Sequence, residues 1–97
     1  MPLHNYELTA IIRPDIDEED VPQVKDRIAN LITEHGGTVN QVNHWGRRKL
    51  AYPIRNFGEG NYVMVELQSE PGNVGEIKSD LNLSEEVFRY LLVRLDN

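Results

Sequence analysis

The chain has 97 residues, of which 39% are hydrophobic and 27% charged, proportions typical of a soluble globular protein. This length predicts one domain over residues 1–97, because separate domains below about 50 residues rarely hold a core of their own. No apolar run approaches the roughly 20 residues that span a bilayer, and the start "MPLHNYEL" lacks the pattern of a secretion signal, so we expect a cytoplasmic protein with no membrane partner. The absence of cysteine excludes a disulfide framework, a thiolate nucleophile and a zinc knuckle.

Charge is unevenly distributed along this acidic chain, which carries 10 Lys and Arg against 16 Asp and Glu, a net charge of -6. The segment 36–57 has no carboxylate and four cations, namely Arg47, Arg48, Lys49 and Arg55. The other 75 residues hold six cations against sixteen carboxylates, a charge of -10. The pattern predicts an acidic body with a basic hairpin, and such a local basic site can still bind phosphates at short range.

The first elements in the sequence are a predicted strand and helix. Apolar and polar residues alternate over 5–14, which predicts a half-buried strand ending near Arg13. Apolar residues then recur at helical spacing from Val21 to Ile32, the full set being Val21, Val24, Ile28, Leu31 and Ile32. Pro22 suits a first helical turn, so we place the N-cap near Asp20 and the C-cap at Gly36 or Gly37.

The middle of the chain predicts a hairpin. A long, interrupted strand covers 38–43 and "KLAYPI", and because Pro53 cannot donate a ladder hydrogen bond, this strand belongs at a sheet edge or bulge. The two glycines of "NFGEG" predict a turn, and "NYVMVELQ" predicts a third strand over 61–68. In that strand one face carries Val63, Val65 and Leu67, and the other carries Tyr62, Met64 and Glu66. We expect Tyr62 and Met64 to lie on the sheet face away from the helices.

The last elements are a second helix and a fourth strand. Pro71 suits a helix start, and Val74, Ile77 and Leu81 follow at spacings of three and four. "VFRYLLVRL", residues 87–95, predicts a strand. The order is βαββαβ, which predicts an α+β, ferredoxin-like split βαβ fold: a four-stranded antiparallel sheet with two helices on one face. The other face is then free for a partner.

The sequence contains no convergent catalytic or metal-binding pattern. His4, His35 and His44 are scattered and show no metal-ligand spacing, and the serines lack a nucleophile motif. The acids of "DIDEED" lack the glycine and the terminal glutamate of a calcium loop. We therefore expect no enzyme activity, no catalytic residue, no metal, no cofactor and no small-molecule substrate.

The basic segment "WGRRKLAYPI", residues 45–54, has two interpretations. Its cations could keep an edge strand soluble, a role that edge cations often have. They could instead bind phosphate, because arginine offers a planar fork for phosphate oxygens, and Trp45, Tyr52 and Tyr62 offer surfaces for a base or ribose. Packing against the protein is an alternative role for Trp45 and Tyr52.

The stretches "NYE", "HGG", "WGRRKLAYPI" and "GNYVMVEL" resemble bacterial small-subunit ribosomal protein six over almost the whole chain. The resemblance implies a structural, non-catalytic protein of ribosome assembly and translation. It would bind the central domain of small-subunit ribosomal RNA together with small-subunit ribosomal protein eighteen, a basic partner. The candidate RNA-binding residues are Arg47, Arg48, Lys49, Arg55, Tyr62, Arg89 and Arg94. The candidate partner-binding residues are Trp45, Tyr62 and Met64. The family's basic residues before the tyrosine of the first strand are His4 and Asn5 here, a weaker cationic start.

Two other protein classes share the predicted fold. An RNA-recognition-motif protein would bind single-stranded RNA on the free sheet face, but "GNYVMVEL" holds only Tyr62 where two or three stacking aromatics are expected. A small ferredoxin-like enzyme or ligand-sensing domain would need a convergent polar pocket. Fold alone does not separate these classes, because this topology hosts many functions.

Overall fold

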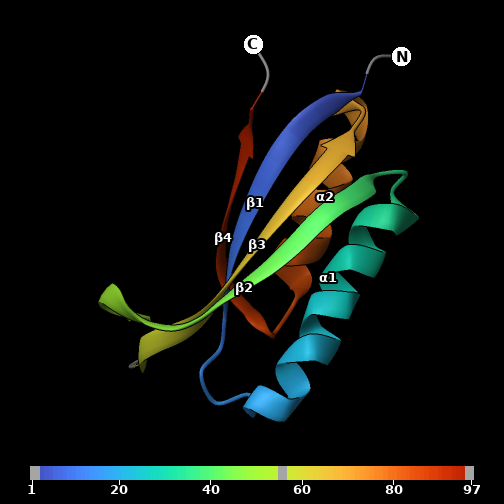
Figure 1. Cartoon of the computed structure of the whole chain (residues 1–97). Helices are drawn as coiled ribbons and strands as arrows, with labels where there is room; N and C mark the ends of the chain where they lie inside the picture. The colour runs from blue at the N-terminus through green and yellow to red at the C-terminus, as the bar shows by residue number, and fades with distance from the viewer. Residues whose placement is uncertain (1–2, 55–56, 96–97) are drawn as a thin grey trace.

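A computed structural model of the chain describes residues 3–54 and 57–95, with the backbone alone for 51–54 and 57. Its elements follow the predicted order of strand, helix, strand, strand, helix, strand (Figure 1). Their bounds are β1 His4–Ile12, the 3-10 turn η1 Glu18–Asp20, α1 Val21–Glu34, β2 Thr38–Ile54, β3 Phe57–Ser69, α2 Pro71–Leu83 and β4 Val87–Arg94.

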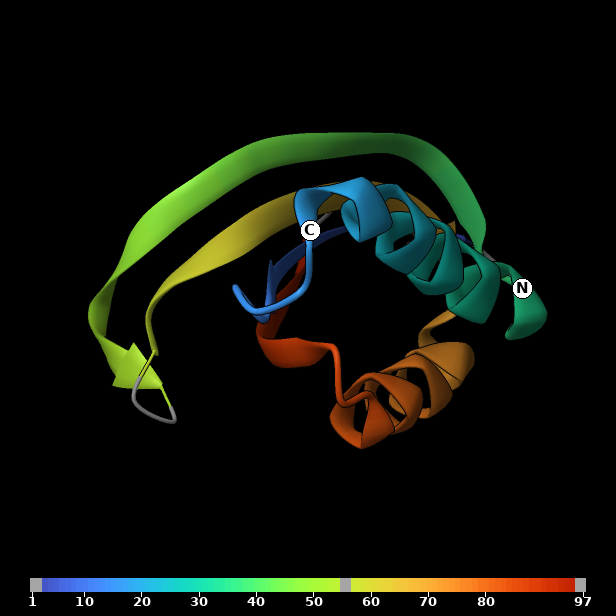
Figure 2. The same ribbon diagram turned by 90° about the horizontal axis from the view of Figure 1, so that it is seen from below.

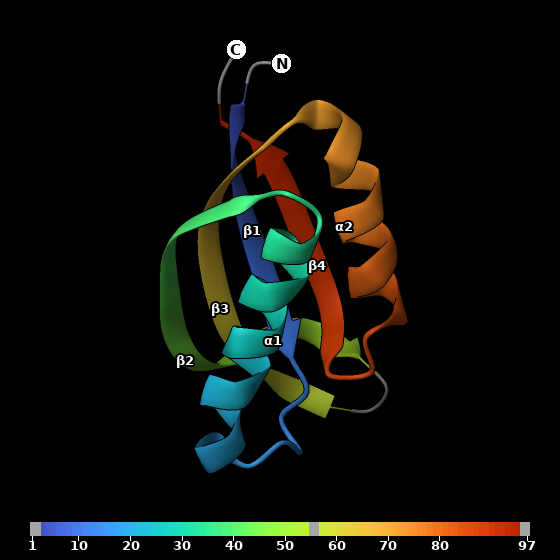
Figure 3. The ribbon, with the colours of Figure 1, turned by 90° about the vertical axis from the view of Figure 1, so that its right-hand side faces the viewer.

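The four strands form one antiparallel sheet in the order β2-β3-β1-β4. Strands β3 and β1 lie in the centre of the sheet, and β2 and β4 form its edges. Both helices lie on the same face of this sheet, and the opposite face carries no other element of the described chain (Figure 3). The predicted ferredoxin-like fold is confirmed.

The core lies between the sheet and the helices. Alternate residues of β1 are buried because they face the helices, and the apolar stripe of α1 meets them as its helical spacing predicts. Leu31 is only partly buried at the side of this stripe. The buried apolar set is Tyr6, Leu8, Ala10, Ile12, Val21, Val24, Ile28, Ile32, Val63, Val65, Leu67, Ile77, Leu81 and Val87.

Helix α1 begins as expected, and its C-cap lies one residue before the first of the two expected positions. Asp20 is the N-cap and Pro22 lies in the first turn, as predicted. The C-cap is His35, whereas the sequence predicted Gly36 or Gly37. Gly36 instead follows the cap with a φ of 80°, the left-handed position that glycine prefers just beyond a helix. The prediction was wrong by one residue because glycine marks the residue after the cap.

The hairpin between β2 and β3 is longer than expected, and the turn predicted at "NFGEG" is wrong in part. Gly58 and Gly60 lie inside β3, which begins at Phe57, and the connection at 55–56 lies outside the described residues. Gly60 is opposite Arg48, and a Cβ atom at this position would lie 2.4 Å from Ile11 Cγ2. This glycine allows close packing of β3 on β1, a use that sequence cannot separate from a turn.

Strand β2 is an edge strand, as Pro53 predicts, and it is irregular. Its pairing with β3 shifts register between Val39 and Gln41, between His44 and Gly46, and between Lys49 and Ile54, the last stretch including Pro53. Such irregularities bend and twist a strand. The far end of the hairpin accordingly curves away from the helices and the rest of the sheet (Figure 2).

The C-terminal half follows the prediction closely. Helix α2 starts at Pro71 and buries Ile77 and Leu81, with Val74 packed at the side of the core. Strand β4 ends at Arg94, one residue before the predicted end. Neither helix in the described part of the chain has the length and hydropathy that a membrane span requires.

Candidate nucleic-acid interface

The free sheet face is organised in rows of side chains, because paired residues on neighbouring strands lie side by side. Val63, Val65 and Leu67 are fully buried under the helices, so Tyr62 and Met64 lie on the opposite, free face, as predicted. The pairing gives one row of Gly46, Tyr62, Ile11 and Arg89, a second of Asn43, Met64, Thr9 and Leu91, and a third of Gln41, Glu66, Glu7 and Val93.

A bulge in β2 lies at the first of these rows. His44 is opposite Val63 and Gly46 is opposite Tyr62, so Trp45 is the extra residue without a partner on β3. Gly46 has a φ of 87°, which other residues adopt only with strain. Trp45 is 47% exposed and lies outside the core, so one part of its side chain packs against the protein and the other part is open to a ligand. The side chain of Tyr52 lies outside the described residues.

The bulge helps to form an open hollow next to the basic segment. Trp45, Arg48 and Tyr62 line this hollow, whose volume is about 530 Å³. We call it the aromatic hollow. Arg48 is two residues beyond Gly46 on the same strand, so its side chain returns to the free face. The structure therefore brings two aromatic rings and a guanidinium together from β2 and β3.

The three consecutive cations are exposed but differ in their surroundings. Arg47 Nη2 donates to the carbonyl oxygen of Pro14 at 2.9 Å, and Arg47 Nη1 lies 3.6 Å from Glu59 Oε2. Lys49 is opposite Glu59 in the strand pairing. Although segment 36–57 contains no carboxylate, Glu59 on the neighbouring strand lies close to Arg47 and opposite Lys49. In the part of the chain that the structure describes, Arg48 and Lys49 make no ion pair or side-chain hydrogen bond.

The remaining candidate cations divide between the two ends of the molecule. Arg89 is exposed on β4 in the same row as Tyr62, and so lies at the basic end of the free face. Arg94 is opposite Tyr6, on the helix side of β4, and its Nη2 lies 2.8 Å from His4 Nδ1. These two positions are five residues apart, or about 16 Å along the strand. Arg94 is thus separate from the other cations, and Arg55 lies outside the described residues.

The far end of the free face is acidic. Glu7 and Glu66 are directly opposite each other on β1 and β3, and both are partly buried. Like charges in such a pair repel one another and destabilise the sheet. The free face therefore changes from cationic and aromatic at the Tyr62 row, through the Met64 row, to acidic at the Glu66 row.

His35 lies between two carboxylates, one at each of its ring nitrogens. Its Nδ1 lies 3.0 Å from Glu76 Oε2 and its Nε2 lies 2.6 Å from Asp80 Oδ2. The hydrogen bond to Asp80 raises the pKa of His35, and the charges of Asp80 and Glu76 act in the same direction, whereas burial opposes them. This contact was not expected from the sequence, although Glu76 and Asp80, four residues apart on a helix, indicate a pair of carboxylates on one helix face. No group of three or more histidine, cysteine or carboxylate side chains among the described residues could hold a metal ion.

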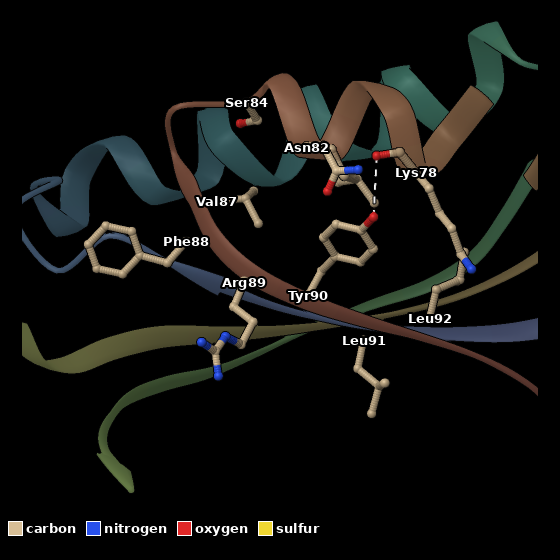
Figure 4. A pocket seen from close by; sticks show the side chains of 10 residues that line it. Lys78, Asn82, Ser84, Val87, Phe88, Arg89, Tyr90, Leu91 and Leu92 are labelled. Carbon is tan, nitrogen blue, oxygen red and sulfur yellow. Dashed lines mark hydrogen bonds between the residues drawn. The ribbon is translucent and has the colours of Figure 1, made fainter. Parts of the chain in front are cut away.

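A second surface groove runs between α2 and β4, with a volume of about 480 Å³ (Figure 4). Tyr90 points toward α2 and its hydroxyl donates to the carbonyl oxygen of Lys78 at 3.3 Å, while Arg89 and Leu91 point to the other side of β4. No carboxylate or histidine lines the described groove.

Comparison with known proteins decides among the classes that share this fold. Residues 5–94 match the family of ribosomal protein S6. The chain belongs to the ribosomal protein S6 family. Small ribosomal subunit protein bS6 of Moorella thermoacetica is 39% identical over 97% of this chain and 96% of its own length. The bS6 protein of Microcystis aeruginosa is 44% identical over 96% of this chain and 72% of its own length.

Solved structures agree with S6 family membership. The crystal structure of 30S ribosomal protein S6 from Thermotoga maritima has a TM-score of 0.89 and 29% identity, and covers 96% of this chain and 88% of its own. The C-terminal domain of the MgtC protein from Mycobacterium tuberculosis has a TM-score of 0.62 at 15% identity over 95% of this chain and 87% of its own, a likeness of fold alone. The S6 family consists of structural, non-enzymatic proteins of the small ribosomal subunit, so the chain's location is the cytoplasmic ribosome.

Proposed function

We propose that this S6 family member binds small-subunit ribosomal RNA, in its central domain, through the basic end of the β2–β3 hairpin. The observation that supports this most directly is the position of Arg48 and Lys49. Both are exposed and have no partner in the described part of the chain; Arg48 lines the aromatic hollow, and Lys49 is the next residue along β2. Cations without an internal partner are available to phosphate oxygens, and neutralising phosphates is the main source of affinity for nucleic acid. Arg89 and Tyr62 border the same end and contribute to the RNA surface, whereas Arg47 is held by the Pro14 carbonyl and lies near Glu59.

The proposed protein partner is small-subunit ribosomal protein eighteen, which binds the rest of the free sheet face. Met64, Leu91 and Val93 provide apolar contact there, and Leu91 is 63% and Val93 42% exposed. The opposed carboxylates of Glu7 and Glu66 favour a basic partner, because a cation between them removes their repulsion. Trp45 and Tyr62 lie where the two proposed surfaces meet.

This division of the face explains how a chain with a charge of -6 can join a polyanion. Tyr62 and Glu66 are four residues apart on one strand, or about 13 Å, which exceeds the Debye length of about 8 to 10 Å in physiological salt. The carboxylates are therefore largely screened from a phosphate at Arg48. The basic partner supplies further phosphate neutralisation and covers the acidic row. Arg94 has no part in this surface and we expect its replacement to leave RNA binding unchanged.

Sedimentation with ribosomal subunits tests the proposal. The wild-type protein should co-sediment with small subunits lacking this protein at moderate salt. The double variant Arg48→Ala with Lys49→Ala should be released at a lower salt concentration, because fewer phosphate contacts hold it. A matched control, Lys25→Ala on α1, removes a cation far from the hairpin in sequence and should behave as wild type. Absence of the wild-type protein from the subunits would refute the proposal.

A further inference from the structure

The aromatic hollow has a composition that indicates the kind of group it can hold. Its lining consists of Trp45, Arg48 and Tyr62, with no aliphatic side chain and no carboxylate among the described residues. Its volume of about 530 Å³ falls within the range of about 300 to 1,000 Å³ that small-molecule sites have. Two π-faces and one cation suit a flat ring that carries a negative charge.

The position of the hollow within the fold makes it a fixed site. Trp45 is the extra residue of the bulge, and Gly46 holds the left-handed conformation that this bulge requires. Tyr62 lies on the inner strand β3 and is paired there with Ile11 of β1 and Gly46 of β2. Rings held by paired strands offer contact area at little cost in conformational entropy.

We propose that the aromatic hollow holds one unpaired nucleotide of the bound RNA, with its base stacked on Trp45 and its phosphate at the Arg48 guanidinium. This inference rests on the proposed RNA-binding function and names the contact that the hollow makes. An aromatic ring accepts any base, because every base has a π-face, so the site reads an unstacked nucleotide and not a sequence. Arg48 supplies the counter-charge, and Lys49 lies next to it on the strand.

A nucleotide fits the hollow better than a side chain of the protein partner. Arg48 has no internal partner in the described part of the chain. Covering it with a basic protein would therefore cost free energy, because like charges repel across an interface. The acidic and apolar rows of Glu66 and Met64 are the parts of the face that suit a basic protein, and they lie beyond the hollow along β3. The hollow thus lies at the boundary between the proposed protein-binding surface and the proposed RNA-binding surface.

The single tryptophan of the chain permits a direct test. The chain is labelled with 5-fluorotryptophan, so its one ¹⁹F resonance reports on Trp45. The probes are small-subunit ribosomal protein eighteen and a central-domain fragment of small-subunit ribosomal RNA, added in that order. We expect the resonance to move little when the protein partner binds and to shift clearly when the RNA is added, since a stacked base changes the magnetic environment of the indole.

Two substitutions separate stacking from apolar contact. Trp45→Phe keeps a π-face and should leave the RNA affinity of the complex within about threefold of wild type. Trp45→Leu keeps apolar area but no π-face, and should weaken RNA binding about tenfold, within the range of stacking effects per base. Because Trp45 lies where the two proposed surfaces meet, the affinity for the protein partner is measured separately for each variant, and RNA binding is measured with that partner at saturation. Circular dichroism melts establish that both variants are folded.

The outcomes distinguish this inference from the proposed function. If the complex binds RNA but the ¹⁹F resonance is unmoved and Trp45→Leu binds as wild type does, the hollow holds no base and RNA binding still stands. A resonance that shifts with the protein partner and not with RNA assigns the hollow to that protein and overturns the inference. If no RNA is bound in any combination, both the proposed function and this inference are wrong.

Discussion

Neighbouring cations in the basic segment have different surroundings and hence different expected roles. Arg47 contacts the Pro14 carbonyl and approaches Glu59, whereas Arg48 is free of such contacts in the described part of the chain. Arg47 therefore joins the hairpin to the loop after β1. Arg48 is available to a ligand. Sequence alone presents them as one basic cluster, but the structure separates them.

We predict that Arg47→Ala mainly lowers the stability of the protein and that Arg48→Ala mainly weakens RNA binding. Arg48→Ala should leave the melting temperature unchanged and reduce the slope of log RNA affinity against log salt by about 0.7 to 0.9, the value of one lost phosphate contact. Arg47→Ala should reduce stability by at most about 1 kcal/mol, because exposed ion pairs contribute little and one hydrogen bond is lost. Thermal melts and salt titrations of the complex with RNA measure both quantities. Equal effects of the two changes on both would contradict the assignment.

His35 links the end of α1 to α2 through its two carboxylate neighbours. Both ring nitrogens face an acceptor, an arrangement that the protonated imidazole satisfies and the neutral form does not. The C-terminal end of α1 also favours a positive charge at this position. The contact therefore makes the stability of the protein depend on pH.

We predict a loss of stability as the pH rises through the titration of His35. Because the pKa of His35 is raised in the folded state, its contribution is complete below the unfolded value of about 6.5 and is lost as the pH rises through the folded value. Urea unfolding between pH 5.5 and 9 should show this loss in the wild type. His35→Gln should remove the pH-dependent part, and Asp80→Asn should reduce it. An identical pH dependence in wild type and His35→Gln would refute the prediction.

At the scale of elements, the hairpin depends on glycines with different functions. Gly46 takes a positive φ in the bulge, whereas Gly60 lies in a regular part of β3 where Ile11 approaches closely. At Gly58, two residues earlier in β3, a Cβ atom would have no neighbouring atom within 4 Å. The two glycines of "GEG" therefore differ in their tolerance of a side chain.

We predict that Gly60→Ala destabilises the protein and Gly58→Ala does not. A Cβ at position 60 would clash with Ile11 Cγ2, so the Ile11 side chain or the strands must shift, and such overpacking costs about 1 to 3 kcal/mol. For a domain of this size the melting temperature should fall by about 4 to 8 °C for each kcal/mol. The matched change at Gly58 should stay within about 2 °C of wild type. Calorimetry of the two variants decides, and equal melting temperatures would show that the contact relaxes freely.

The sequence predicted the elements that depend on periodicity and missed features that depend on contacts between strands. The sequence predicted the apolar stripe of α1 and the alternation of β3, because burial follows the 3.6 and 2.0 residue periods. It also predicted the edge position of β2, because Pro53 cannot donate a ladder hydrogen bond. The function of Gly60 depends on Ile11, and the neutralisation of Arg47 depends on Glu59 across the sheet. The separation of Arg94 from Arg89 depends on which face of β4 each occupies. Predicting these three features requires knowledge of the register in which the strands pair.

At the scale of the whole molecule, charge is arranged along the free sheet face in the order in which the two proposed partners would bind. The cations and aromatic rings are at the end near the hairpin, and Glu7 and Glu66 are at the other. The helices cover the opposite face (Figure 3). An acidic protein can thereby present a local phosphate site while its carboxylates face a basic protein.

The central claim is that the RNA is bound jointly with the basic partner, and a gel-shift titration tests it most directly. A central-domain fragment of small-subunit ribosomal RNA is titrated with this protein in the presence and absence of small-subunit ribosomal protein eighteen. The charge of -6 opposes binding by the isolated chain, so we expect affinity to rise at least about tenfold when the partner is present. The double variant Glu7→Gln with Glu66→Gln should retain less of this gain, because its surface attracts the basic partner less strongly. Equal RNA affinity with and without the partner would contradict the account.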